Sequence, residues 1–283
     1  MEISKRSLLG LACSASLVLV SFLSFSCSGE AITEVGILPE NGYPLRFNVV
    51  LDGHVSARAG GKDIWTNGDK IGVQLYDKTS VYQISNDASS LEPSEFSETL
   101  YWKNTAKSVV KAWFPANKQD NVNISNQSSG YSNFDFLYAE KEMTFTSVGT
   151  EATLSFKHLM SKVECTVTTD YSDLTVNSVK FLGIVQGSFD AGIVSASSLY
   201  GDITPEKSLE SPLKYTAILF PMQIKRDEFF IRVDTNKGEF VFKLGADTDN
   251  NLKAGFCYKF NFEIKSNIGT GNLKLRSLSS DLF

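Results

Sequence analysis

Short runs in which apolar and polar residues alternate recur along the chain from Leu45 onward, and clusters of Gly, Asn, Asp and Ser separate them. Alternation with a period of two places successive side chains on opposite faces of a strand. Many short strands with turn residues between them are typical of all-β proteins. We therefore predict an all-β fold with strands at residues 46–51, 70–76, 99–102, 108–114, 142–145, 152–156, 162–168, 176–182, 187–189, 215–220, 228–234, 239–244 and 255–265.

These runs form two consecutive series of six or seven strands. Each series is enough for one β-sandwich, so we expect an N-terminal sandwich at residues 45–170 and a C-terminal sandwich at residues 171–283. Helical periodicity is limited to short candidates at residues 157–161 and 190–199. Residues 117–133 are rich in Asn and Ser and too long for a tight turn, so we expect an exposed loop there, with a binding loop as the less favoured interpretation.

The amino terminus has the features of an export signal. Basic residues precede an apolar run that ends in small residues and a leucine directly before Cys27, as in the cleavage box of bacterial lipoproteins. We predict a signal peptide at residues 1–26, a lipidated tether at residues 27–44, and acyl chains such as palmitate on Cys27 that hold the mature chain to a membrane. Phe25 stands where a small residue is usual, so ordinary signal peptidase cleavage remains the alternative.

Composition and charge narrow the classes of function. The 283 residues are 42% hydrophobic, which is ample for a packed core, and 27 Lys and Arg against 32 Asp and Glu give a net charge of -5. This balance argues against binding to nucleic acid. The two histidines, His54 and His158, are 104 positions apart, and no hydrolase or nucleotide-binding motif accompanies them. We therefore expect neither an enzyme nor a cofactor.

No disulfide or metal site is expected in the mature chain. Cys165 shares a predicted core face with two valines, whereas Cys257 shares its face with polar residues, so the two thiols are expected to lie in opposite environments. Asp247 and Asp249 present oxygens at alternate positions, as a calcium loop would. Leu252 stands where such a loop needs glycine, so a hairpin loop is favoured over a metal site.

Several segments, in their order and spacing, resemble one known family. They are the lipoprotein start, Ser56-Ala57-Arg58-Ala59 before Trp65, Ala112-Trp113-Phe114-Pro115, Asp135-Phe136-Leu137-Tyr138-Ala139, Leu154-Ser155-Phe156-Lys157-His158 and the closing Ala254-Gly255-Phe256-Cys257-Tyr258. Together they resemble the fimbrillin family of Bacteroidales surface lipoproteins. The resemblance implies two β-sandwiches of transthyretin-like topology and a fimbrial (pilin) subunit or fimbria-like adhesin. It also implies a lipid-anchored precursor at the outer membrane and cell surface that joins a fimbrium after processing.

The resemblance also implies a maturation step. In that family an Arg-specific protease removes the first strand and opens a groove for a strand of the next subunit. Arg58 is the best match for the cleavage position, and Arg46 is the runner-up. The removed strand is expected to carry Phe47, Val49 and Leu51 on one face, filling the groove until it is cut out.

The carboxy-terminal tail is a candidate donor strand for a neighbouring subunit, because Leu273 and Leu275 share one face. An ordinary edge strand is the equally weighted alternative. The expected partners are other fimbrial subunits, in a homopolymer or a heteropolymer, the membrane through Cys27, and a host protein or glycan.

Two other functions are compatible with the sequence. A monomeric glycan-binding surface lipoprotein would use exposed aromatic residues such as Tyr131, Trp102 or Trp65 to stack on sugar rings. A hydrolase would depend on His158 or on a pair of carboxylates, and it is the least favoured, because a structural histidine is the simpler interpretation.

Overall fold

The structure is a computed structural model that describes residues 35–52, 65–85, 91–145, 152–209, 213–266 and 271–282. In these ranges the chain folds into 22 strands and one short 3-10 helix, η1 (Tyr131–Phe134), so the predicted all-β class is confirmed. No helix in these ranges has the length and apolarity needed to span a bilayer.

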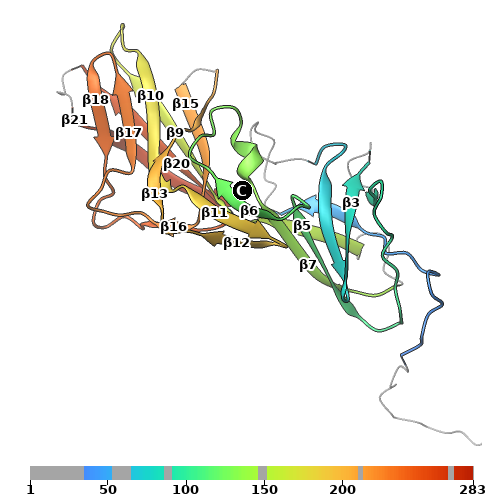
Figure 1. Cartoon of the computed structure of the whole chain (residues 1–283). Helices are drawn as coiled ribbons and strands as arrows, with labels where there is room; N and C mark the ends of the chain where they lie inside the picture. Colours follow the sequence, from blue (N-terminus) through green and yellow to red (C-terminus); the bar gives the residue numbers. More distant parts are fainter. Residues whose placement is uncertain are drawn as a thin grey trace, which may run out of the picture. The chain divides into compact units, whose positions relative to one another are not determined.

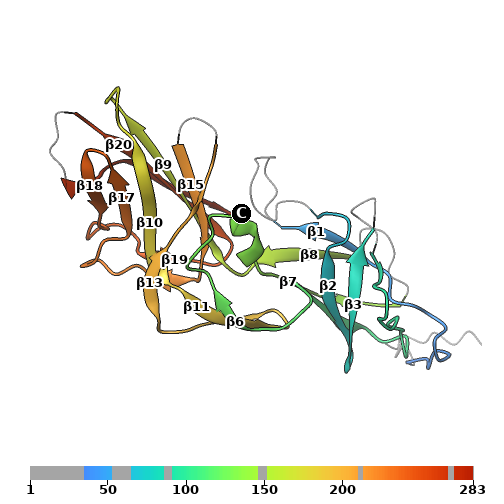
Figure 2. The same cartoon turned by 45° about the horizontal axis from the view of Figure 1, so that its top comes forward.

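A seven-stranded sheet contains the first strand of the described chain. Its order is β1-β8-β7-β5-β2-β3-β4, and β1 lies at one edge beside β8 (Figure 2). β1 and β8 are parallel, whereas the remaining neighbours in this sheet are antiparallel. The strands are β1 (Asn48–Leu51), β8 (Thr153–His158), β7 (Leu137–Met143), β5 (Ser108–Phe114), β2 (Lys70–Leu75), β3 (Lys78–Ile84) and β4 (Leu91–Pro93).

One face of this sheet buries its own hydrophobic cluster. Alternate residues of β1, β2, β5 and β8 point into it, as the period of two predicts. The cluster comprises Leu45, Phe47, Val49, Leu51, Trp65, Ile71, Val73, Leu75, Tyr82, Ile84, Leu100, Trp102, Val110, Ala112, Leu137, Ala139, Met143, Ala152, Leu154 and Phe156.

Two five-stranded sheets face each other across a second, larger hydrophobic cluster (Figure 1). Phe242 of β18 contacts Phe260 and Phe262 of β20, with ring centroids 5.8 and 5.1 Å apart, so the two sheets form a β-sandwich. One sheet contains β14 (Glu206–Lys207), β15 (Leu213–Leu219), β9 (Ser161–Thr169), β20 (Phe256–Ile264) and β22 (Lys274–Leu282) in that order. The other contains β13 (Tyr200–Ile203), β10 (Val176–Ile184), β17 (Ile231–Thr235), β18 (Gly238–Phe242) and β21 (Gly271–Asn272).

Two small sheets complete the described structure. One has the order β12-β11-β6, with β12 (Ile193–Ala196), β11 (Gln186–Asp190) and β6 (Gln119–Asn123). The other pairs β16 (Met222–Gln223) with β19 (Asn251–Leu252).

The exposed loop predicted at residues 117–133 is wrong. β6 pairs with β11, and Val122, Ile124 and Tyr131 are buried in the larger cluster. Gln127 is also buried, because its side chain exchanges hydrogen bonds with the backbone N–H and C=O of Ile218. Long-range pairing of this kind gives a polar segment partners that local sequence does not reveal.

The two predicted helical segments are also wrong. Residues 157–161 contain the end of β8 and the start of β9, and residues 190–199 contain β12. Ala191 and Gly192 take φ values of 45° and 83°, which a two-residue hairpin turn requires, so β11 and β12 form a hairpin.

Residues 35–283 group into one compact unit. β9 lies before residue 170 in the sequence, yet it pairs with β15 and β20 in the second half of the chain. The division into sandwiches at 45–170 and 171–283 stays a prediction.

Candidate functional site

The segment at residues 35–52 lies along two different parts of the chain. Its first half runs antiparallel to residues 100–105, and its second half, β1, runs parallel to β8. The amides of Trp102 and Thr105 donate to the carbonyls of Tyr43 and Gly36, both at 2.9 Å. The backbone of the segment is therefore hydrogen-bonded well before β1 begins.

β1 continues this pairing at the edge of the seven-stranded sheet. Its register places Val49 beside Leu154 and Leu51 beside Phe156. Just after the strand, the Asp52 amide donates to the carbonyl of Phe156 at 2.7 Å. β8 thus has β7 on one side and β1 on the other, and β1 is its sole partner on that side.

The side chains of this segment alternate strictly between the core and solvent. Leu45, Phe47, Val49 and Leu51 are 3%, 6%, 4% and 7% exposed, and the intervening residues are exposed. The Phe47 ring lies 5.8 Å from the ring of Tyr82. Burial of each such side chain is worth about 1.5–3 kcal/mol, so the segment is a substantial part of the cluster.

If this segment were absent, it would leave a slot lined by unpaired backbone groups and apolar side chains. Residues 153–156 and 100–105 would present unpaired backbone N–H and C=O groups. The four buried positions would leave an apolar trench between them. Another strand of matching pattern could satisfy both at once.

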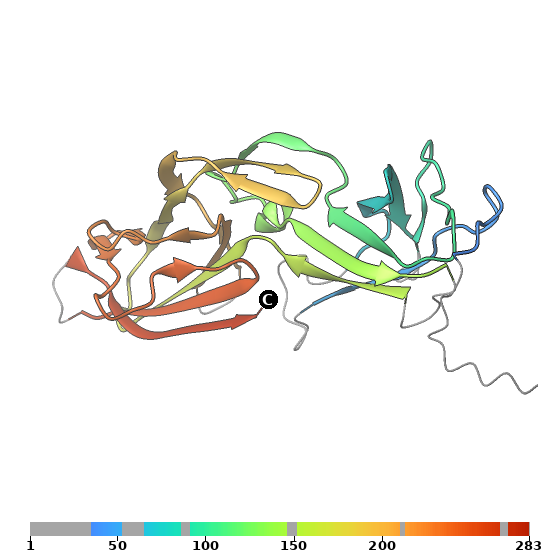
Figure 3. The same ribbon diagram turned by 90° about the horizontal axis from the view of Figure 1, so that it is seen from below.

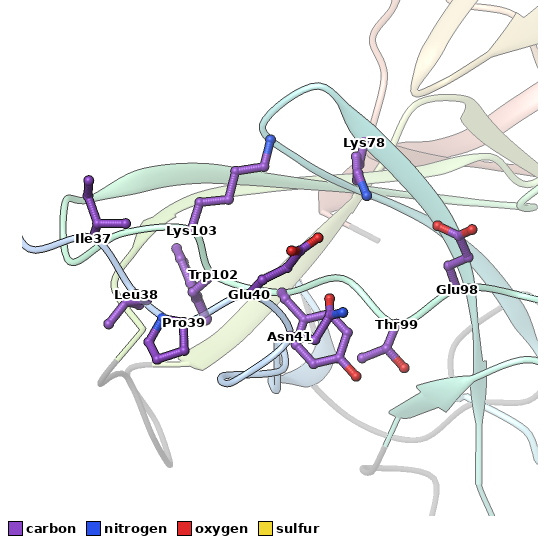
Figure 4. Close-up of a pocket in the computed structure, with 11 residues that line it drawn as sticks. Ile37, Leu38, Pro39, Glu40, Asn41, Lys78, Glu98, Thr99, Trp102 and Lys103 are labelled. Carbon is purple, nitrogen blue, oxygen red and sulfur yellow. The ribbon is translucent and has the colours of Figure 1, made fainter.

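A surface groove of about 660 Å³ lies where the segment meets the rest of the chain (Figure 4). Ile37 and Leu38 line one end, and Lys78 and Glu98 lie at the other. One wall is part of residues 35–52 and the other is not. The groove therefore exists only while the segment is in place.

The carboxy-terminal tail forms the edge strand of another sheet. β22 runs antiparallel along β20, from Lys274 beside Glu263 to Leu282 beside Phe256 (Figure 3, red and orange strands). Leu273 is buried in the larger cluster, and Leu275 is partly buried against it. Asp281 lies 2.6 Å from the ammonium group of Lys259.

A family model described as fimbrillin-like matches residues 57–277. The chain belongs to the fimbrillin-like family. This confirms the family suggested by the sequence motifs, over more than three quarters of the chain.

Solved structures share the fold of this fimbrillin-like chain. A candidate cell adhesion protein from Bacteroides ovatus has a TM-score of 0.63 and 19% identity, over 85% of this chain and 98% of that one. A similar one from Bacteroides uniformis has a TM-score of 0.60 and 17% identity, over 86% and 99%. The tip fimbrial protein Mfa3 from Porphyromonas gingivalis, with a C-terminal truncation, has a TM-score of 0.51 and 10% identity, over 84% and 100%. No curated protein matches the chain.

Of the residues predicted to take part in processing, the structure describes Arg46 but not Cys27 or Arg58. Arg46 is exposed two residues before β1 begins, between the buried Leu45 and Phe47. A cut after Arg46 would leave β1 attached to the chain, whereas a cut after Arg58 would separate all of residues 35–52 from it.

The aromatic residues proposed as sugar platforms are not on the surface. Tyr131, Trp102 and Trp65 are 5%, 3% and 7% exposed, so this part of the glycan-binding alternative is wrong. Each packs in a hydrophobic cluster, because burying a large aromatic ring lowers the free energy more than exposing it to water would.

His158 belongs to a buried polar pair. Its Nδ1 lies 2.9 Å from both carboxylate oxygens of Asp135, and the two side chains are 3% and 0% exposed. The pair joins the end of β8 to the residue that follows η1. This geometry fits a structural corner, because a buried pair gives a substrate no access.

The other candidate sites have simple structural roles. Cys165 is buried, as predicted from the valines on its face. Cys257 is buried as well, so the opposite environments expected for the two thiols are wrong: β20 lies between β9 and β22, and burial raises the pKa of Cys257 to about 12. In the loop after Gly245, an Asp249 oxygen accepts the amide hydrogen of Asn251. Within the described ranges, no three His, Cys, Asp or Glu side chains come together in a way that could hold a metal ion.

Sequence reasoning missed the pairing of residues 36–45 with 100–105. Gly36, Pro39 and Gly42 indicated flexible chain, and the predicted tether included them. The signal that could have revealed the pairing is the apolar Leu38 and Leu45 at the two ends of this stretch, which pack on the first cluster.

Proposed function

We propose that this chain is a fimbrial subunit or fimbria-like adhesin that is exported as a lipoprotein precursor. Proteolysis after Arg58 breaks the covalent link to the N-terminal segment, and a strand from a neighbouring subunit then displaces it. Membership of the fimbrillin-like family and the shared fold of the Mfa3 tip protein support a fimbrial or adhesive role at the cell surface.

The observation that carries this proposal is the position of residues 35–52. They precede Arg58, they lie at a sheet edge, and they supply four buried apolar side chains. A single cut therefore converts a covalently attached strand into an exchangeable one. Removal exposes edge hydrogen-bonding groups together with an apolar slot, the two features that strand addition satisfies.

The segment is expected to stay bound after the cut until another strand replaces it. Four buried side chains at about 1.5–3 kcal/mol each are comparable to the total stability of a small domain. Replacement by a strand of similar pattern would exchange one set of contacts for another at little net cost. Assembly would then be driven by the neighbour's better fit and by loss of the released segment.

A reversible lock on β1 tests the exchange. Val50 and Ser155 are paired in register on the exposed face of β1 and β8, where parallel strands lie about 4.8 Å apart and a disulfide can form. The Val50→Cys/Ser155→Cys variant, cut after Arg58, should retain residues 35–58 in mild denaturant when oxidised and lose them when reduced. Each single variant is the matched control, and native mass spectrometry measures the retained mass.

Two results would contradict the proposal. One is an Arg-specific protease that leaves the folded chain intact at residue 58, with Arg58→Lys as the control for the position of the cut. The other is a cut, reduced chain from which the segment cannot be displaced by any competing strand.

Lipidation is tested separately at Cys27. Cells that express the full chain should incorporate a palmitate analogue into it, and Cys27→Ala should abolish that label and release the protein from membranes. Cys257→Ala, which removes a buried thiol, is the matched control and should leave the label unchanged.

A further inference from the structure

The slot filled by residues 45–51, which include β1, sets a strict requirement on any replacement strand. Its four inward positions hold Leu45, Phe47, Val49 and Leu51, and each is at most 7% exposed. A small side chain at one of these positions would leave a cavity, and a polar one would be buried without a partner. A replacement therefore needs large apolar side chains at four alternate positions.

The carboxy-terminal tail of this chain lacks that pattern. Any four alternate positions within residues 271–283 contain at most two large apolar side chains. In a regular strand, Leu273 and Leu275 share one face with two serines, and Leu278 and Leu282 share the other with an arginine and a serine. β22 has a bulge that turns Leu278 toward the same cluster as Leu275, but the β1–β8 register in the slot is unbroken and has no counterpart to that bulge. The maximum of two holds whether the tail enters the slot parallel or antiparallel to β8, because the strand direction does not change which residues share a face.

The tail is also engaged within its own subunit. β22 pairs with β20 along its length, and Leu273 is buried in the larger cluster. The side-chain amide of Asn261 donates to the hydroxyl of Ser277 at 2.9 Å, across the same pair of strands. Donation of the tail would expose β20 and part of this cluster, and would gain only two apolar contacts in the slot.

We infer that the strand that replaces β1 comes from a different protein and not from a second copy of this chain. This rests on the strand exchange proposed above. The partner strand carries large apolar side chains at four alternate positions, with polar residues between them. The chain therefore extends a fibre only together with a second kind of subunit that supplies this strand.

Labelled peptides can test this inference on the cut chain. One peptide has the sequence of residues 43–53, which is the present occupant, and one has the sequence of the tail, residues 271–283. A redesigned tail carries Ser277→Val and Ser279→Leu, which creates four apolar side chains in alternation with Leu273 and Leu275. A control tail carries Lys274→Val and Asp281→Val, which adds as many apolar residues and keeps the net charge, yet leaves at most two at any four alternate positions.

The cut chain should take up the 43–53 peptide, as measured by fluorescence anisotropy and native mass spectrometry. The natural tail should bind at least about a hundredfold more weakly, because it lacks two of the four apolar side chains. The redesigned tail should recover most of this loss, and the control tail should bind as weakly as the natural one. Light scattering should show that the cut chain alone remains monomeric.

Three results would overturn the inference while leaving strand exchange intact. They are growth of multimers from the cut chain alone, binding of the natural tail within about threefold of the 43–53 peptide, and failure of the redesigned tail where the 43–53 peptide binds. Uptake of no peptide at all, including the chain's own segment, would overturn the proposed function and this inference with it.

Discussion

Neighbouring residues in the N-terminal segment contribute very differently to stability, according to the face they occupy. Phe47 is buried beside Tyr82, whereas Asn48, the next residue, is exposed. The alternation of the sequence predicted this difference, because neighbouring residues on a strand point to opposite sides.

Phe47→Ala should destabilise the uncut protein by about 3–5 kcal/mol, because it removes a buried ring and leaves a cavity. Asn48→Ala should change the free energy of unfolding by no more than about 0.5 kcal/mol. Urea denaturation of both variants gives the comparison. Equal, small effects would show that residues 45–51 contribute little to the cluster.

Gly187 is a position where the surrounding atoms leave no room for a side chain. A Cβ atom there would lie 2.5 Å from the carbonyl oxygen of Ser195 and 2.4 Å from the Phe220 ring. Gly187→Ala should therefore destabilise the protein by about 1–3 kcal/mol, because backbone and a buried ring would have to move.

Gly245→Ala is the matched control for Gly187→Ala, because its nearest neighbour would lie 3.6 Å away, at ordinary contact distance. Thermal unfolding should show a clear loss for the first variant and almost none for the second. A neutral Gly187→Ala would mean that the β11–β12 hairpin adjusts easily.

At the scale of elements, local pattern predicted many of the strands and few of their partners. It missed β3, and at residues 99–102 the structure has only an isolated bridge at Tyr101. Alternation identified β1 and β8 because each has one buried and one exposed face. It failed for β6, where a polar segment is held by pairing with β11, about 65 residues away. It also failed for β12, because the turn at Ala191 and Gly192 reverses the chain in a stretch that looked helical.

The β22 element should stay in place when the N-terminal segment leaves. Cys257 of β20 lies between Lys162 of β9 and Asp281 of β22, and burial raises its pKa to about 12. Its thiol is therefore neutral and protected at pH 8, and alkylation should be slow both before and after the cut at Arg58.

Labelling followed by mass spectrometry measures these rates. Cys165, which is fully buried in the core, is the internal control and should react only in the unfolded protein. Rapid labelling of Cys257 after the cut would indicate that β22 detaches, as it would if the tail were the donor strand.

At the scale of the whole molecule, the sequence was sufficient for the fold class and the family but not for the geometry of the site. It placed Phe47, Val49 and Leu51 on one face, because their spacing is local. It could not show that β1 runs parallel to β8, which lies about 105 residues later. It also could not show that residues 36–45 pair with residues 100–105, because those contacts join segments without a shared sequence signal.

The central claim is that residues 35–52 occupy a slot that another strand can fill. The amides of Trp102 and Thr105 report on it directly, because each donates to a carbonyl of this segment at 2.9 Å. The backbone amide of Phe230, which donates to the carbonyl of Phe242 at 2.7 Å in the β-sandwich, is the internal control.

Hydrogen exchange at these amides is the most direct measurement. In the uncut chain, Trp102 and Thr105 should be protected. After the cut at Arg58 and removal of the segment, both should lose protection while Phe230 keeps it, and addition of a peptide with the sequence of residues 35–53 should restore it. Unchanged protection at Trp102 and Thr105 after the segment has left would contradict the account, because it would show that no open slot had formed.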